Sequence, residues 1–333
     1  MSKITDVYGS MQGEFPAENY VENSVRLASL CEKVGFSGAL VHFNHRVPDP
    51  WQLSSLLIQN SQTFVPMVAV QPYYMPPFAL AKTIASISFL NGRRVALNMV
   101  AGSTPGELRQ VGDTLDHDAR FKRMDEYLQA VGCLLSADGP IDHEGPNYRY
   151  RKLRAIDTVE GTVRPPKVFI AGSSDSAKDL CIRHRAVAVT NPSPVDLFSA
   201  EFASKLQGKT EIGIRIGLIA RETREEAWSA AKQYFPPSRV AYMNVKLNGR
   251  ASDSVWRKGL SDHSHSEVHD NVYWLGAFLA GGSHSPFLVG TYEDVAEYLG
   301  RYVASGVTAL ILASPWEEYE SNADLMDRAG LRI

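Results

Sequence analysis

The feature that most constrains the fold of this chain is a regular alternation of short apolar segments with amphipathic ones. The segments Gly38–Phe43, Phe64–Val70 and Arg94–Val100 are almost wholly apolar, and helical patterns at Trp51–Asn60 and Phe78–Leu90 separate them. Runs that are apolar throughout, rather than at every second position, are typical of parallel strands covered on both faces. The pattern therefore predicts strand–helix units in a parallel sheet.

The same alternation continues to the end of the chain. Further strands are predicted at Val168–Ala171, Ala186–Thr190, Ile212–Ala220 and Val307–Ala313, and a weak first strand near Ile4–Tyr8 brings the total to eight. The helical patterns between and after them are His117–Leu135, Asp175–His184, Pro194–Leu206, Arg224–Tyr234, Thr291–Ala304 and Trp316–Ala329. Eight strand–helix units close most simply into a single (β/α)8 TIM barrel over residues 1–333. An open doubly wound sheet is the competing arrangement.

Two irregular stretches interrupt the alternation, near residues 137–166 and 235–286. We expect both to be insertions in loops at the C-terminal face of the barrel, where long loops often form lids or substrate walls. The second stretch contains His263, His265 and His269, which lack the helical spacing and nearby carboxylate of a zinc-protease site. A solvated loop is the favoured interpretation of this cluster, and no metal site is predicted.

Composition excludes several classes of protein. The formal net charge of −3 gives no field that would attract nucleic acid or an anionic membrane. The polar first 19 residues do not resemble a secretory signal, and no stretch approaches 18 consecutive apolar residues, so a cytoplasmic location is expected. The scattered Cys31, Cys133 and Cys181 indicate reduced thiols rather than disulfides or a zinc site.

The segment Ala171-Gly172-Ser173-Ser174-Asp175 lies where a predicted strand ends and a helix begins. A glycine that lets the backbone approach a ligand, exposed amides at a helix start and two hydroxyls are suited to bind a phosphate. An ordinary helix N-cap would use the same residue types. A second turn of small residues, Asn98 to Ser103, follows another strand at the same end of the barrel, which favours a site large enough for a cofactor.

Several blocks together resemble the bacterial-luciferase-like flavin-dependent monooxygenases, in particular the alkanesulfonate monooxygenases. They follow in family order from about Val34 to the C-terminus: Leu90 to Arg93, Asn98 to Ser103, Leu115 to Phe121, Ala171 to Asp175, Gly213 to Arg215 and Arg221 to Thr223. The resemblance implies a barrel enzyme that receives reduced FMN from a separate NAD(P)H-dependent flavin reductase and uses O2 to oxygenate an organic substrate. It also implies a homodimer or a higher homo-oligomer.

The resemblance further assigns residues to the cofactor. Gly172, Ser173 and Ser174 would hold the FMN phosphate, with His117 and the position of Phe121 assisting. Asn98 to Ala101 would lie beside the flavin ring. Family members usually have tyrosine in place of Phe121, so one phosphate hydrogen bond, worth about 1 kcal/mol, would be missing here.

The chain departs from the alkanesulfonate monooxygenases around the substrate. Val47, Gly217, Ala280 and Ser314 or Pro315 stand where those enzymes have cysteine, histidine, arginine and tyrosine, and of that set only Arg215 persists. A pocket with fewer polar donors is poorly suited to a small sulfonate anion. We therefore expect a larger or less charged substrate.

The second predicted strand ends in His42-Phe43-Asn44-His45-Arg46, which brings two imidazoles to the mouth of the barrel. His42 could act as an acid or base beside the flavin, since imidazole titrates near neutrality, and His45 is a second candidate. Both histidines could instead only cap loops.

Three other functions remain possible from the sequence. An F420-dependent oxidoreductase could use the same barrel without oxygen. The lost polar residues are also compatible with a flavin-binding protein that has no turnover. A phosphate-binding aldolase is disfavoured because no lysine lies within the predicted strands.

Overall fold

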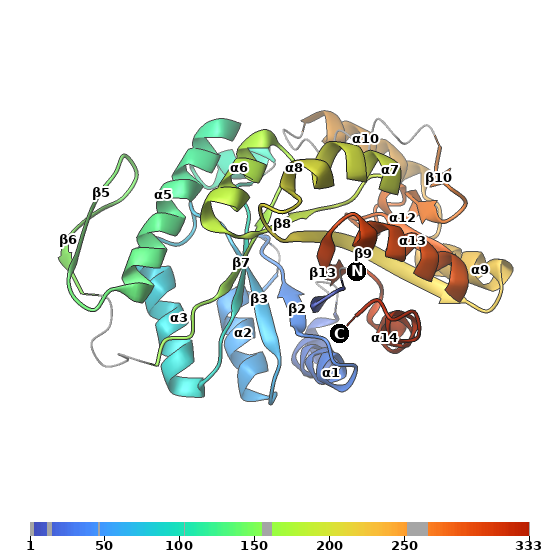
Figure 1. Ribbon diagram of the computed structural model, residues 1–333, viewed down its shortest axis with the longest axis horizontal. Helices are drawn as coiled ribbons and strands as arrows, with labels where there is room; N and C mark the ends of the chain where they lie inside the picture. Colours follow the sequence, from blue (N-terminus) through green and yellow to red (C-terminus); the bar gives the residue numbers. More distant parts are fainter. Residues whose placement is uncertain are drawn as a thin grey trace.

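The computed structural model describes residues 3–11, 15–45, 47–102, 104–154, 162–251 and 266–332. Its centre is a closed barrel of eight parallel strands that are hydrogen-bonded in the order β1-β2-β3-β4-β7-β8-β9-β13, with β13 returning to β1 (Figure 1). The strands are β1 (Asp6–Ser10), β2 (Gly38–Val41), β3 (Val65–Val70), β4 (Ala96–Met99), β7 (Lys167–Ala171), β8 (Val187–Thr190), β9 (Ile212–Arg221) and β13 (Val307–Leu312). All eight coincide with predicted strands, so the (β/α)8 barrel is confirmed and the open sheet is wrong.

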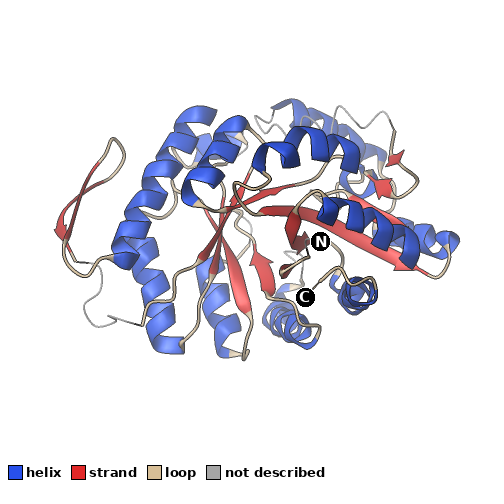
Figure 2. Cartoon of the chain, in the orientation of Figure 1, coloured by secondary structure: helices blue, strands red, loops and turns tan. Residues whose placement is uncertain are grey.

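Helices cover the outside of the barrel (Figure 2). They are α1 (Tyr20–Lys33), α2 (Pro50–Gln59), α3 (Pro77–Asn91), α4 (Pro105–Gln110), α5 (His117–Ser136), α6 (Asp175–His184), α7 (Val195–Phe198), α8 (Ser204–Leu206), α9 (Arg224–Tyr234), α13 (Tyr292–Ala304) and α14 (Tyr319–Arg328). The predicted helix Pro194–Leu206 is α7 and α8 joined by a π-helical turn at Ser199–Ala203. No helix in the described ranges has the length and apolar character required to cross a bilayer.

The two insertions differ in position. The second lies between α9 and α13, beyond the carboxyl end of the barrel part of β9: it contains α10 (Arg239–Ala251), β10 (Val268–His269), β11 (Tyr273–Trp274) and α12 (Gly276–Leu279), and β12 (Phe287–Thr291) follows it. β12 pairs with the outer half of β9, from Gly217 to Arg221. The first insertion differs from our expectation because it joins α5 to β7, which is a connection at the amino-terminal end. It forms the hairpin of β5 (Ile141–Glu144) and β6 (Arg149–Leu153), which folds along the outside of α5 (Figure 1).

The barrel interior is filled by one apolar cluster, which we call the barrel core: Tyr8, Leu40, Met67, Ala69, Ala96, Phe169, Val187, Val189, Ala309 and Ile311. Because side chains alternate along a strand, the residue two positions after a core residue also faces inward, one layer nearer the carboxyl end. Those positions are polar on several strands. They form the floor of the cavity at the barrel mouth.

Candidate active site

A cavity of about 230 Å³ opens at the carboxyl ends of the strands, where TIM-barrel enzymes have their active sites. Its floor is the inward layer just above the barrel core, which we call the rim layer: His42, Gln71, Asn98, Ala171, Asn191 and Arg215. Five of these residues follow a core residue by two positions, and Arg215 follows Gly213, whose backbone faces Val187, Val189 and Ala309 inside the barrel. Strand periodicity alone therefore brings six residues from six strands to one surface.

The structure brings together nine of the ten predicted site residues around this cavity: His42, Asn98, Ala101, His117, Phe121, Gly172, Ser173, Ser174 and Arg215. His45 is the exception, because it lines a neighbouring cavity of about 400 Å³ with Tyr73, Tyr74 and Val111. Phe43 lines both cavities. Of the three histidines in the second insertion, His263 and His265 lie outside the described residues, and His269 is in β10.

The two predicted small-residue bends do converge, because β4 and β7 are hydrogen-bonded neighbours. Both bends use glycine in a backbone conformation that other residues rarely adopt, with φ of +89° at Gly102 and +152° at Gly172. A Cβ atom at Gly172 would lie 2.9 Å from the Cβ of Ala177, and one at Gly102 would lie 2.7 Å from Leu108. The close approach of backbone and helix therefore requires glycine at both positions.

The starts of two helices meet beside the second bend. His117 is the first residue of α5, and Ser174 is the N-cap of α6, where its hydroxyl accepts from the amide of Ala177 at 3.3 Å. The two starts are linked through Asp118, which accepts from His117 Nδ1 at 2.8 Å and from the Ser176 hydroxyl at 3.2 Å. Unpaired amides and aligned helix dipoles make this corner favourable for an anion. We call it the phosphate corner.

The two serines of the phosphate corner have different environments. Ser174 is used as the helix cap, so the N-cap interpretation holds for it. Ser173 Oγ is buried and has no hydrogen-bond partner within the described structure. The hydroxyl of Ser173 is thus available to a ligand, and that of Ser174 is already engaged.

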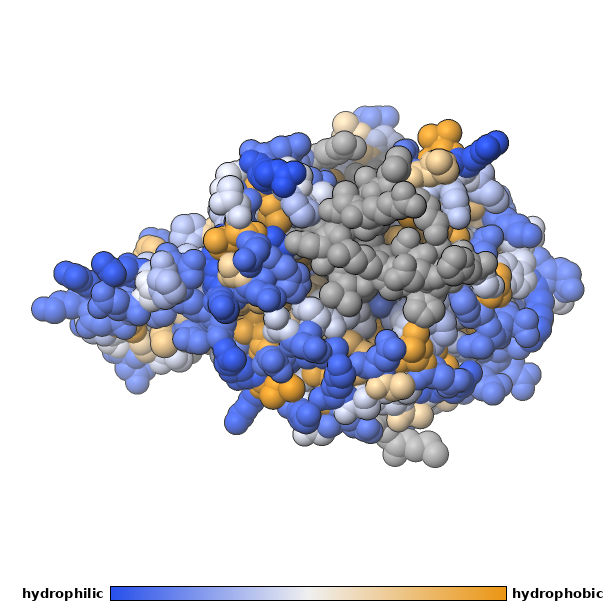
Figure 3. All heavy atoms as spheres, turned by 90° about the horizontal axis from the view of Figure 1, so that it is seen from above, coloured by the Kyte–Doolittle hydropathy of each residue, from blue (hydrophilic) through white to orange (hydrophobic). Residues whose placement is uncertain are grey.

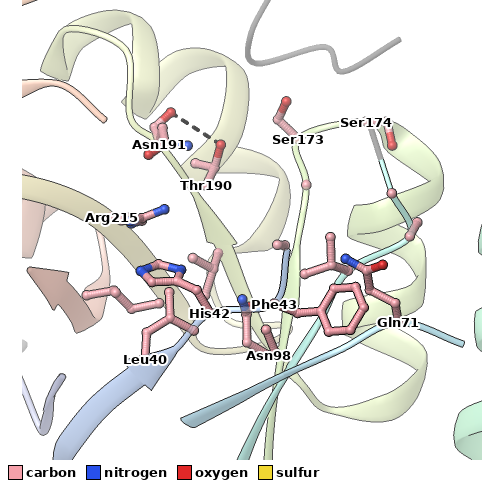
Figure 4. Close-up of a pocket in the computed structure, with 18 of the residues that line it drawn as sticks. Leu40, His42, Phe43, Gln71, Asn98, Ser173, Ser174, Thr190, Asn191 and Arg215 are labelled. Atoms are coloured by element: carbon pink, nitrogen blue, oxygen red, sulfur yellow. Dashed lines mark hydrogen bonds between the residues drawn. The ribbon is translucent and has the colours of Figure 1, made fainter. Parts of the chain in front are cut away.

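Four buried polar atoms without a hydrogen-bond partner belong to residues that line the cavity: Gln71 Oε1, Asn98 Oδ1, Ser173 Oγ and Arg215 Nε. Buried polar groups are nearly always paired, so several orphans around one space indicate a site built for a polar ligand. Figure 4 shows Gln71 and Asn98 at the floor and Ser173 and Ser174 at the upper edge. The array extends from the rim layer to the phosphate corner, which fits a molecule with a polar ring system and a terminal phosphate.

His42 and Arg215 lie next to each other on the opposite side of the cavity (Figure 4). Desolvation, with smaller contributions from the positive charge of Arg215 and from His284, lowers the pKa of His42 to about 3. Desolvation also lowers the pKa of Arg215 to about 10, so the guanidinium stays charged at neutral pH. We expected His42 to titrate near neutrality. Instead its imidazole is neutral and can serve as a hydrogen-bond donor or acceptor.

Three polar residues that line the cavity were not predicted from the sequence: Gln71, Thr190 and Asn191. Gln71 and Asn191 each follow a core residue by two positions, and that spacing was the signal that could have found them. Asn191 Oδ1 accepts from Ser285 at 2.6 Å, which ties the second insertion to the cavity wall. His284, next in sequence to Ser285, was missed because only the folded insertion brings it near His42.

The fold and the array of free polar atoms define a (β/α)8 barrel with a polar ligand cavity at its mouth. Comparison with known proteins gives the class: residues 7–309 match the family described as luciferase-like monooxygenase. The chain belongs to the luciferase-like monooxygenase family and is a flavin-dependent monooxygenase. The predicted special likeness to the alkanesulfonate enzymes stays a prediction.

One relative is the 4-(gamma-L-glutamylamino)butanoyl-[BtrI acyl-carrier protein] monooxygenase BtrO of Niallia circulans. It is 36% identical over 315 residues, which cover 92% of each chain. Among solved structures, the EDTA monooxygenase EmoA of Chelativorans sp. BNC1 has a TM-score of 0.76 at 17% identity, over 99% of this chain and 95% of that one. At this identity the likeness shows the fold alone.

The same fold holds different cofactors. The oxygenating constituent of 3,6-diketocamphane monooxygenase from Pseudomonas putida, in complex with FMN, has a TM-score of 0.71 at 16% identity, over 100% of this chain and 99% of that one. An F420-dependent secondary alcohol dehydrogenase, in complex with an F420–acetone adduct, has a TM-score of 0.67 at 15% identity, over 98% of each chain. The choice of cofactor therefore depends on the site itself.

Proposed function

We propose that this protein binds reduced FMN delivered by a separate NAD(P)H-dependent flavin reductase and uses O2 to oxygenate an organic substrate. The observation that carries the proposal is the set of four unpartnered buried polar atoms that extends from the rim layer to the phosphate corner. Reduced flavin, when bound, supplies the electrons that activate O2. The chain's own residues would position the cofactor, exclude water and orient the substrate.

The phosphate corner would hold the FMN phosphate through the Ser173 hydroxyl, the backbone at Gly172 and the two helix starts. His117 lies over Phe121, with ring centroids 4.9 Å apart, so the imidazole would be held in place against the phosphate. The side chains of Gln71 and Asn98 would bond the polar edge of the ring. Ala101, at the first bend, leaves room beside that ring because its side chain is small.

Arg215 and His42 would serve the substrate side of the cavity. The Arg215 guanidinium has no carboxylate partner in the described part of the chain, so it can bind an anionic or partly negative oxygen of the substrate. The neutral His42 imidazole could donate a hydrogen bond to, or accept one from, a polar substrate atom next to the reacting carbon without adding charge. His45, in the neighbouring cavity, would contact only a part of the substrate that extends past Phe43.

The charge next to the phosphate corner favours FMN over F420. A groove of about 760 Å³ continues outward from this corner, and it is lined by the carboxylates of Asp118, Asp175 and Glu201 and the ammonium groups of Lys178 and Lys205. Both lysines bond to Asp175, at 3.2 and 3.3 Å. F420 carries an acidic chain beyond its phosphate, and this groove would repel it, whereas FMN ends at the phosphate.

For the substrate we propose an acyl group carried as a thioester on a carrier protein. This extends to the present chain what the name of BtrO states for that relative, with which it shares 36% identity along nearly the whole length. The loss of polar side chains expected from Val47, Gly217 and Ala280 agrees with an acyl chain better than with a small sulfonate. Arg215 would bind the thioester carbonyl oxygen or a distal carboxylate.

The test is an anaerobic titration of the protein with reduced FMN and, separately, with reduced F420, followed by tryptophan fluorescence. We expect saturable quenching by reduced FMN and much weaker quenching by F420. A butanoyl thioester is then added together with a pulse of oxygen. The product should be about 16 Da heavier than the substrate with unlabelled O2 and about 18 Da heavier with 18O2, because one oxygen atom is inserted. Tight binding of reduced FMN with no oxygen incorporated into any thioester would support the non-catalytic flavin-binding alternative.

A further inference from the structure

The β5–β6 hairpin projects from the side of the barrel and has no role in the site described above. Strand β6 carries Arg149, Arg151 and Lys152, and Arg154 follows it directly; all four cations are exposed. The facing strand contributes only the two carboxylates of Asp142 and Glu144. The hairpin is therefore a positively charged arm on a protein whose net charge is −3, and Figure 3 shows its hydrophilic surface at one end of the molecule.

Local contacts do not account for two of these cations. Arg149 pairs with Glu144 at 3.1 Å. Neither Arg151 nor Lys152 makes an ion pair within the described part of the chain. The side chain of Asp142 bonds the backbone amide of Lys152, at 2.9 Å, and does not neutralise its ammonium group. Both side chains extend into solvent.

A backbone irregularity coincides with these two cations. The pairing of β5 with β6 shifts register between Ile141 and His143, and Lys152 has a φ of +48°, a strained value for a residue with a side chain. In a regular strand Arg151 and Lys152 would point to opposite faces. Here both are exposed, between the half-buried Tyr150 and Leu153. A strained backbone retained at two exposed cations without ion pairs is a feature expected of a binding surface.

The hairpin is fastened to the wall of the active-site cavity. Glu126 of α5 accepts bonds from the backbone amides of Asn147 and Tyr148, at 3.0 and 2.7 Å. The Tyr148 hydroxyl donates to the carbonyl of Pro72 at 3.1 Å, and the Tyr150 hydroxyl accepts from the amide of Phe78 at 3.3 Å. Pro72 and Phe78 both belong to the segment that follows β3, which runs from Gln71 to the first turn of α3. Gln71 of that segment lines the main cavity, and Tyr73 and Tyr74 line the neighbouring one.

We propose that strand β6, through Arg151 and Lys152, is the docking surface for the acidic carrier protein that presents the acyl substrate on its phosphopantetheine arm. The inference rests on the proposed function, since it assumes a carrier-bound substrate. Carrier proteins are small acidic helical bundles, and complementary charge both steers their approach and fixes their orientation. A carrier docked on β6 lies beside the segment after β3, from which its arm can reach the cavity mouth.

The test compares the variant Arg151→Glu/Lys152→Glu with a control, Lys209→Glu/Lys232→Glu, which makes the same change in net charge at exposed positions away from the hairpin. The bonds that fasten the hairpin involve neither Arg151 nor Lys152, so the variant should fold normally. The probe is a butanoyl-loaded acyl carrier protein with a fluorescent label, whose binding is followed by fluorescence anisotropy. We expect the Kd to rise about 10-fold or more in the hairpin variant at low salt, and less at 0.5 M NaCl. The control should bind like the wild type.

Turnover separates failure of this inference from failure of the proposed function. With butanoyl pantetheine, which has no carrier protein, both variants should match the wild type, whereas with the loaded carrier only the hairpin variant should show a raised KM. An unchanged Kd and KM for the loaded carrier in the hairpin variant would overturn the docking surface and leave carrier delivery intact. If the wild type neither binds nor oxidises the loaded carrier but oxidises butanoyl pantetheine, carrier delivery and the docking surface both fall, and the monooxygenase assignment stands.

Discussion

The two serines of the phosphate corner allow ligand binding and fold stability to be separated. Ser173 Oγ is buried without a partner, and Ser174 Oγ caps α6. The change Ser173→Ala removes a hydroxyl that only the phosphate would use. A hydrogen bond to a charged group is worth about 1.5–3 kcal/mol, so the Kd for reduced FMN should rise between about 10-fold and 150-fold. The apoprotein should be as stable as the wild type or slightly more so.

The change Ser174→Ala should have the reverse effect. Loss of an N-cap costs about 1 kcal/mol, and it should appear as a lower free energy of unfolding in urea. The Kd for reduced FMN, measured by anaerobic fluorescence titration, should rise less than in the Ser173 variant. If Ser173→Ala binds reduced FMN like the wild type, or if only Ser174→Ala weakens binding, then the orphan hydroxyl is not a phosphate ligand and the orientation proposed for the cofactor is wrong.

Three further predictions concern the cavity and the hairpin. The pKa of His42 is about 3 in the folded protein, whereas the pKa of an unfolded histidine is about 6.5. Between pH 7 and pH 5 only the unfolded chain takes up this proton, so the wild type should lose about 2 kcal/mol more of its free energy of unfolding than His42→Gln does. Urea titrations at both pH values would measure the difference. Arg215→Met removes a desolvated charge, so the Tm of the apoprotein should rise by about 2 °C or more while kcat/KM falls about 100-fold; a lower Tm with normal turnover would contradict the role of Arg215. Glu126→Gln weakens the bonds to Asn147 and Tyr148 by about 1–3 kcal/mol, and amide hydrogen exchange should quicken in residues 141–153 but not in the barrel strands. Equal exchange in variant and wild type would show that Glu126 does not hold the hairpin.

Much of the fold was predictable because its strands carry a strong local signal. Strands such as β3 and β8 are buried on both faces, so nearly every residue is apolar and each segment stands out without knowledge of its partners. The first residues of α6 and α9 were also predictable, since Ser174 and Thr223 are favourable N-caps. The short strands β10 and β11 were not, because each has only two residues and forms only through tertiary pairing, β10 with β11 and β11 with β12.

The site was predictable where a motif marked it and not where only geometry did. Gly172 and Ser173 belong to a recognisable turn, whereas Gln71 and Asn191 look like ordinary loop residues. They reach the cavity because each lies two positions beyond a core residue. His45 illustrates the opposite case. His42 and His45 belong to the same short motif, and His42 lines the main cavity. The strand ends before His45, however, and His45 lines the neighbouring cavity instead.

The sequence by itself determined the number and order of the barrel strands and the small-residue bends at their ends, because apolar runs and glycines act through local conformation and burial. Only the tertiary structure decided which polar groups remain without partners and which charges stand unpaired. The neutral imidazole of His42, the free hydroxyl of Ser173 and the paired exposure of Arg151 and Lys152 all depend on what the folded chain brings next to each residue. Desolvation and hydrogen bonding are properties of those surroundings, and residues far apart in the chain create them.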